Sequence, residues 1–221
     1  MDYRDEHRRR LRALSNDRRA CFAAACATRM VNSYKLVSSL ESIENNLNQL
    51  QAALVFAWDA IAKNEFDKTE VQRLLDQTKK IMKNEKASPF RSRYVYYKAD
   101  AAASVVYTLD LLLGISGYSS TYEFMSNYSS YECANIAIAT ALFYCKRKSK
   151  TNLRGPDFVT EMFNMPPLKI EYARQIRDLS ELATGYSPKL VSAIKTRAEK
   201  EATLFNGDIP SNELPHSSLR A

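Results

Sequence analysis

Arg29 is the residue whose type and surroundings most directly predict a chemical interaction. It lies three residues after Cys26 in an apolar stretch, so a helix places its guanidinium beside a buried stripe. An unpaired buried charge costs several kcal/mol, and Asp59, Asp100 and Asp110 each stand among apolar neighbours. We predict that Arg29 forms a structural ion pair, and we assign Asp59 and Asp100 to it. The sequence leaves open which of Asp59, Asp100 and Asp110 is the partner. The alternative is a polar cavity with perturbed carboxylates.

The sequence contains few of the residues and motifs that histidine-based catalysis, metal binding or phosphate binding requires. The two histidines, His7 and His216, both lie within fifteen residues of an end of the chain, which suits neither a catalytic dyad nor a three-histidine zinc site. The sequence has no Glu-x-x-His motif for a di-metal site in a bundle, and no Walker loop, dinucleotide fingerprint or Gly-x-Ser-x-Gly elbow. We therefore predict no catalytic residues, no metal and no cofactor, and a protein that is not an enzyme.

Two segments rich in tyrosine and basic residues resemble binding surfaces in composition. Tyrosine gives a large contact area at a low entropic cost, and tyrosine and arginine are enriched among the residues that dominate interfaces. The alternative is that half of these tyrosines cap the core with their hydroxyls in water. The predicted partner-binding residues are Arg91, Arg93, Tyr94, Tyr97, Lys98, Tyr118, Tyr122, Tyr128 and Tyr131.

The chain is basic, with a net charge of +7 and a pI near 9.2, which favours acidic partners. The positive charge gathers in the segment 68–100, with nine basic and four acidic residues, and in the run 146–154, with five basic residues and no acid. A further cluster, Arg8, Arg9, Arg10 and Arg12, lies in the first helix. Such runs are usually solvated surface. Their functional interpretation is nucleic-acid binding, which the interrupting acids of the first helix disfavour.

The elements that position these residues are predicted to be helices throughout. Five glycines in 221 residues leave few tight turns for a sheet, and hydrophobic spacing is helical along most of the chain. We predict an all-α, single-domain helical bundle of about seven to eight helices over 1–205, and a polar, flexible tail over 206–221. Helices are expected over 4–14, from 15 or 16 to beyond 34, over 43–62, from 67 or 69 to beyond 82, and over 94–113, 134–145, 169–183 and 188–205. Because 134–145 is apolar on every face, it is the expected central helix.

Cysteine usage and apolar segment length favour a cytoplasmic protein. Cys21, Cys26, Cys133 and Cys145 form no Cys-x-x-Cys pair and stand in apolar helical stretches, as small buried hydrophobes do in a reducing compartment. No secretory signal begins the sequence. The longest apolar stretch, 134–145, is shorter than the roughly 18 residues that span a bilayer, so no membrane association is expected.

Several apolar and polar positions resemble those of a known family. They are Phe22, Cys26, Arg29, Met30, Tyr34, the pairs Trp58-Asp59 and Asp100-Ala101, and the helix start Pro167-x-x-Ile170-Glu171. In these residues the chain, from about 17 to 205, resembles the bacterial YjaG-like family, a domain of unknown function. The resemblance implies an all-α fold and no catalytic residues. The basic first helix, the run 146–154 and the tail depart from the family pattern, which implies a diverged member with its own partner.

These observations lead to one preferred function and several alternatives. The preferred function is a non-enzymatic protein-binding module, most concretely an immunity-type inhibitor that binds and masks a toxin or another partner, such as an acidic toxin domain. A homodimer is a second way to cover the tyrosine-rich surface. The alternatives are a nucleic-acid-binding or signalling and regulatory protein that uses the basic surface, and an enzyme or ligand-regulated protein built on Arg29 and its aspartates.

Overall fold

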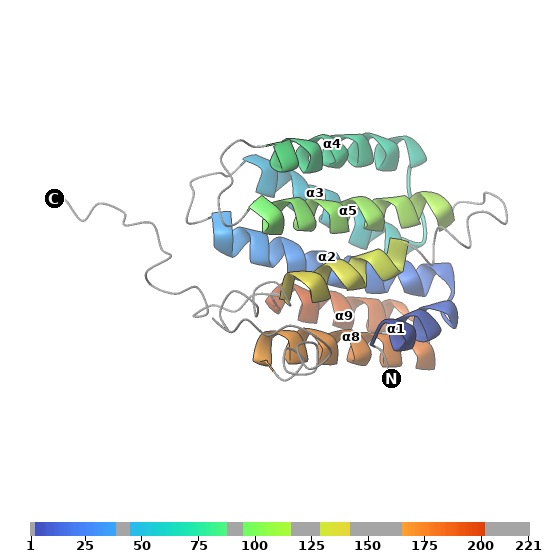
Figure 1. Ribbon diagram of the computed structural model, residues 1–221. Coiled ribbons are helices and arrows are strands. Elements are labelled where there is room, and N and C mark those ends of the chain that lie inside the picture. Colours follow the sequence, from blue (N-terminus) through green and yellow to red (C-terminus); the bar gives the residue numbers. More distant parts are fainter. Residues whose placement is uncertain (1–2, 39–44, 88–94, 116–128, 142–164, 202–221) are drawn as a thin grey trace.

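The computed structural model describes residues 3–38, 45–87, 95–115, 129–141 and 165–201, and these residues form eight helices and no strand (Figure 1). The predicted all-α class is confirmed. The predicted tail 206–221 and the basic run 146–154 lie outside the described residues. The helices are α1 (Tyr3–Arg12), α2 (Asn16–Ser38), α3 (Asn45–Lys63), α4 (Lys68–Ala87), α5 (Val95–Ile115), a helix over 129–141, α8 (Pro166–Thr184) and α9 (Pro188–Lys200).

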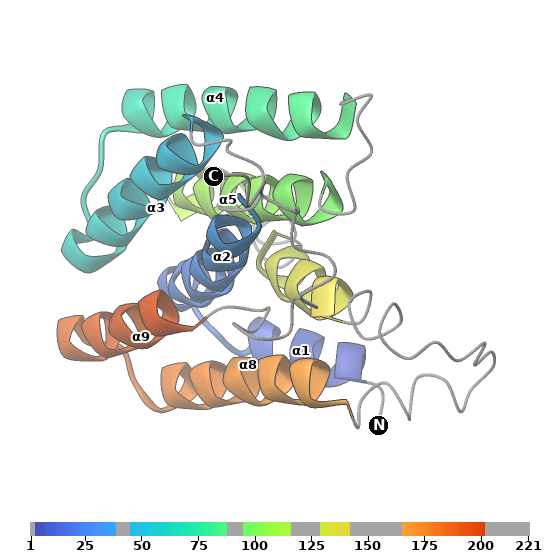
Figure 2. The same ribbon diagram turned by 90° about the vertical axis from the view of Figure 1, so that its left-hand side faces the viewer.

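Helix α2 is the centre of the bundle. It packs against α3, α5, α8 and α9, and every residue from 19 to 31 is buried. Figures 1 and 2 show α3, α4 and α5 on one side of α2 and α8 and α9 on the other. Most of the buried side chains in the middle of α2 are alanines and cysteines. Because these side chains are small, neighbouring helices can approach α2 closely from several directions.

The prediction that 134–145 forms the central helix is wrong. The described helix over 129–141 has an exposed Ala139 and half-buried residues at 131, 132, 135 and 136, so it covers the side of the bundle. It contacts α5, where Cys133 Sγ donates to the Ser104 carbonyl, and α8, where Gln175 donates to the Ala134 carbonyl. The apolar composition of this helix was not enough to predict which helix is central. The small side chains of α2 let more helices pack against it.

Several helix ends follow local signals in the sequence. Asp67 Oδ1 accepts a hydrogen bond from the Thr69 amide and so caps α4 at the first of its two predicted starts, 67 and 69. Ser187 accepts from the Leu190 amide, and Pro188 occupies the first turn of α9, at the predicted helix start. After α3, Asn64 adopts a positive φ of 53°, a conformation that asparagine tolerates better than most residues.

Specific polar contacts tie the outer helices to the centre. Trp58 Nε1 on α3 donates to Thr28 Oγ1 on α2 at 3.0 Å. The side-chain amide of Asn32 on α2 donates to three carbonyls at the end of α9, those of residues 198, 199 and 201. Orphan carbonyls at a helix C-terminus need such donors. Within the described ranges, no helix combines the length and the apolar character needed to cross a bilayer.

The crowded centre of α2 makes a testable prediction about packing. Ala24 is fully buried, and replacing it with leucine should lower the free energy of unfolding by about 2 kcal/mol, because added methylenes force neighbouring side chains out of their rotamers. Urea denaturation measures the change. The control Ala52→Leu, on the exposed side of α3, should shift stability by less than about 0.5 kcal/mol. Equal effects of the two variants would contradict the central placement of α2.

Candidate functional site

Arg29 lies at the contact between α2 and α8, where two carboxylates compensate its charge. Its Nη1 is 2.8 Å from Asp178 Oδ2 and its Nε is 3.3 Å from Glu171 Oε1, and all three side chains are at most 1% exposed. Glu171 and Asp178 lie seven residues apart on α8, which places them on one face of that helix. The predicted ion pair between packed helices exists, with different acids.

The predicted partners of Arg29 are wrong. Asp59 is exposed on α3, Asp100 accepts a hydrogen bond from Thr140 Oγ1 at 3.1 Å, and Asp110 Oδ1 lies 3.9 Å from Lys79 Nζ. Apolar neighbours in sequence do not determine which side of a helix an acid occupies. The signal that was missed is the periodicity of α8, whose buried face reads Glu171, Gln175 and Asp178 at i, i+4 and i+7.

A second layer of charges surrounds this buried group. Asp178 Oδ1 lies within 3.3 Å of Arg177 and of Arg197, and Glu201 Oε1 lies 3.1 Å from Arg177. Glu201 Oε2 is 3.6 Å from the buried Nη1 of Arg29. We call Arg29, Glu171, Asp178 and this second layer the buried charge cluster. It joins α2, α8, α9 and the residue that follows α9.

The electrostatics of the buried charge cluster fit a structural role. Burial disfavours the charged guanidinium of Arg29, but Glu171, Cys26 and Asp178 favour it more strongly, so its pKa lies above the ordinary value. Arg29 therefore stays charged and exchanges no proton. Gln175 donates to Glu171 Oε1 and to the Ala134 carbonyl, which extends the cluster to the helix over 129–141. In the described part of the chain, no three His, Cys, Asp or Glu side chains converge as a metal site would require.

The described cysteines are buried and lie close to this cluster. Arg29 Nη2 donates to Cys26 Sγ at 3.4 Å. Burial raises the pKa of the Cys21 and Cys26 thiols far above the ordinary value and that of Cys133 to about 12. The interpretation of these three cysteines as buried hydrophobes is confirmed, whereas Cys145 lies outside the described residues.

Most of the predicted partner-binding residues lie outside the described ranges. Lys98, however, is only 2% exposed, with Nζ 5.9 Å from the centre of the Tyr34 ring, so its prediction as a partner-binding residue is wrong. Its long side chain lies against an aromatic face in the core. Tyr131 is half-buried, and the Arg8 guanidinium carbon lies 4.6 Å from its ring centre. For Tyr97 only the backbone is described, in α5, and the residues outside the described ranges are Arg91, Arg93, Tyr94, Tyr118, Tyr122 and Tyr128.

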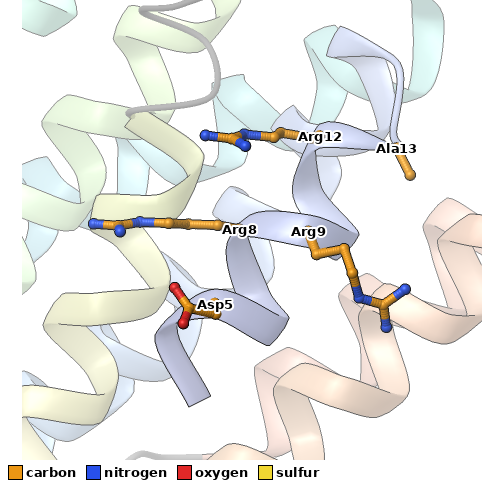
Figure 3. Close-up of a pocket in the computed structure, with 5 residues that line it drawn as sticks. All are labelled: Asp5, Arg8, Arg9, Arg12 and Ala13. Carbon is orange, nitrogen blue, oxygen red and sulfur yellow. The ribbon is translucent and has the colours of Figure 1, made fainter. Parts of the chain in front are cut away.

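An open pocket of about 650 Å³ lies along α1, and no member of the buried charge cluster lines it (Figure 3). All five residues that line it are exposed. Four of them recur at i, i+3, i+4 and i+7 along α1, and Ala13 directly follows the helix. We call this set the arginine face. Its members are Asp5, Arg8, Arg9, Arg12 and Ala13.

The opposite face of α1 holds the helix firmly on the bundle. His7, Leu11 and Leu14 are buried, and the His7 ring lies 5.4 Å from that of Tyr172 on α8. Arg19, at the start of α2, donates to the carbonyls of residues 11 and 12 at 2.9 and 3.2 Å. The arginine face is therefore presented on a fixed support.

The arginines of α1 differ in how their charges are compensated. Glu6 lies 2.8 Å from Arg9 and 2.6 Å from Arg10, and hydrogen bonds from these arginines hold the pKa of Glu6 below its ordinary value. Arg8 and Arg12 make no ion pair within the described part of the chain. Figure 3 shows their guanidinium groups extending in the same direction, one turn apart, while Arg9 points elsewhere. The arrangement is suited to binding an anionic group.

The buried charge cluster predicts a large stability effect at Arg29. Arg29→Met should lower the free energy of unfolding by about 3–5 kcal/mol, because Glu171 and Asp178 would remain buried without their cation. Chemical denaturation measures the loss. Adding Glu171→Gln and Asp178→Asn to Arg29→Met should recover part of it, and the exposed control Arg73→Met should cost less than about 1 kcal/mol. An Arg29→Met variant as stable as the parent would show that the pair is dispensable.

The cysteines predict a pattern of chemical protection. Iodoacetamide at pH 8 should leave Cys21, Cys26 and Cys133 unlabelled in the native protein and label all three in urea, because only the thiolate reacts and burial suppresses it. Peptide mapping by mass spectrometry separates the sites. Native labelling of Cys26 at the unfolded rate would disprove the closed environment around Arg29.

Comparisons with known proteins agree with this fold. Among curated proteins, none matches the chain. A similar solved structure is the crystal structure of a DUF416 family protein from Shewanella baltica OS155, with a TM-score of 0.71 and 18% sequence identity over 87% of this chain and 93% of that chain. The family model described as "Protein of unknown function (DUF416)" matches residues 6–203. A match over that much of the sequence shows that the chain belongs to the DUF416 family.

Proposed function

We propose that this chain is a non-enzymatic protein-binding module that docks an acidic partner protein on the arginine face of α1. The observation that carries the proposal is the pair Arg8 and Arg12, two exposed guanidinium groups one turn apart that line a pocket and lack an ion-pair partner in the described residues. The net charge of +7 supports an acidic partner. Complementary charge speeds encounter and selects among partners.

The support beneath these arginines favours tight binding over a loose surface contact. Arg8 lies over the Tyr131 ring, and Arg19 holds the carbonyl end of α1 in place. A side chain that is already oriented loses less entropy when a partner binds. Arginine and tyrosine together are typical of the few residues that dominate a protein interface.

A protein partner is better supported than a nucleic acid. Asp5 and Glu6 lie on α1 beside the arginines, and Glu6 compensates both Arg9 and Arg10. Strong nucleic-acid binding releases counterions from roughly six to ten phosphates. Two uncompensated arginines in a pocket fit a local carboxylate contact better than an extended phosphate track.

The most concrete form of this proposal is an immunity-type inhibitor that binds and masks a toxin. In this form the partner is an acidic toxin domain, and the chain is a cytoplasmic, YjaG-like member of its family. The engagement of the buried acids Glu171 and Asp178 by Arg29 supports a non-enzymatic role, because these carboxylates serve the fold. A homodimer that uses the same face is the competing arrangement.

The proposal predicts that the arginine face determines partner capture. The tagged full-length protein is used to capture its partner from a nuclease-treated native lysate, and the complex is then reconstituted from purified components. Arg8→Gln with Arg12→Gln should weaken the reconstituted complex about 30-fold, since the two arginines together are expected to contribute about 2 kcal/mol. Titration calorimetry measures the dissociation constant.

A charge-matched control separates local contact from net charge. Lys80→Gln with Lys83→Gln removes two exposed charges from α4, far from α1 in both views of the bundle, and should leave affinity within about twofold (Figure 2). Equal weakening by both double variants overturns the proposal. So does a captured fraction that consists of nucleic acid, or of second copies of this chain alone.

A further inference from the structure

The spacing of the arginine face matches the side-chain repeat of a second helix. Its four helical residues recur at i, i+3, i+4 and i+7, the stripe by which one helix contacts another, and Ala13 follows the end of the helix. Arg8 and Arg12 are four residues apart, which puts them about 6 Å apart along the helix axis. Acids four residues apart on a facing helix repeat at the same distance, so both pairs can form at once.

The charges along this stripe also have a direction. Asp5 lies at the N-terminal end of the pocket, and the two uncompensated arginines follow it (Figure 3). An anionic group is repelled at Asp5 and attracted at Arg8 and Arg12. At the far end, Ala13 is a small side chain that lets another backbone approach closely. A ligand with two acids, and none opposite Asp5, is complementary to this pattern.

We infer that the element docked on the arginine face is an acidic helix of the partner protein, with two glutamates or aspartates four residues apart. This inference rests on the proposed function and specifies the chemistry of the same site. Arg8, stacked on Tyr131, anchors one carboxylate, and Arg12 binds the other. Guanidinium groups suit this contact because they bind carboxylates in a planar, two-pronged geometry.

Two synthetic peptides of equal composition test the inference. Both are about 18 residues long, built on alanine and glutamine, which suffices for an isolated helix. One carries two glutamates four residues apart, and the other carries them two residues apart, so that they share a face only in an extended chain. Fluorescence anisotropy with the full-length protein should show at least about tenfold tighter binding of the first peptide, together with a rise in its helicity on binding.

Variants of the arginine face connect this preference to named residues. Arg12→Gln should abolish the advantage of the first peptide, and the control Lys80→Gln with Lys83→Gln should retain it. Asp5→Asn should tighten binding of the first peptide about twofold, because it removes a repulsive charge. Circular dichroism of each variant confirms that the bundle is folded, so that a loss of binding reports on the site.

The outcomes distinguish the inference from the proposed function. Equal binding of the two peptides, or a preference for glutamates two residues apart, overturns the helical ligand. Absence of peptide binding by a protein whose natural complex still depends on Arg8 and Arg12 also overturns it and leaves the proposed function in place. When the natural complex is insensitive to Arg8 and Arg12 as well, both fail.

Discussion

A guanidinium taken fully out of water needs carboxylates at hydrogen-bonding distance, and Arg29 imposes this requirement on the helices around α2. This requirement explains why the buried face of α8 carries Glu171 and Asp178 among its leucines. Further cations lie near these acids, because Arg177 and Arg197 contact Asp178 and Arg174 lies 4.0 Å from Glu171. The helix positions are thus coupled through charge as well as through packing.

The size of the central side chains is the second constraint on the bundle. The alanines and cysteines of α2 allow close contacts with α3, α5, α8 and α9, and the large side chains of Phe22, Met30 and Tyr34 fill the space that remains. Close contact excludes water from the neighbourhood of Arg29. The low dielectric that results makes its ion pairs strong and makes an unpaired charge costly.

The same residue type therefore serves two purposes in this protein. Inside, Arg29 on α2 contacts Glu171 and Asp178 of α8 and Glu201 after α9, and so connects three segments. Outside, Arg8 and Arg12 lie on a helix whose other face is locked by His7, Leu11 and Arg19, and their charges remain available. A binding surface is most specific when its support is rigid, and α1 has such a support because its arginine face and its buried face are separate.

The sequence by itself determined the helices, two candidate starts for α4, the start of α9 at Pro188 and the need of Arg29 for an acid, because these depend on residues within one or two turns. Only the tertiary structure decided that the acids are Glu171 and Asp178, that α2 is central, and that Arg8 and Arg12 line a pocket. Arg29 and Glu171 are 142 residues apart. Which helix faces meet over such a separation depends on how all the helices pack together. The periodicity of a single helix does not determine its neighbours.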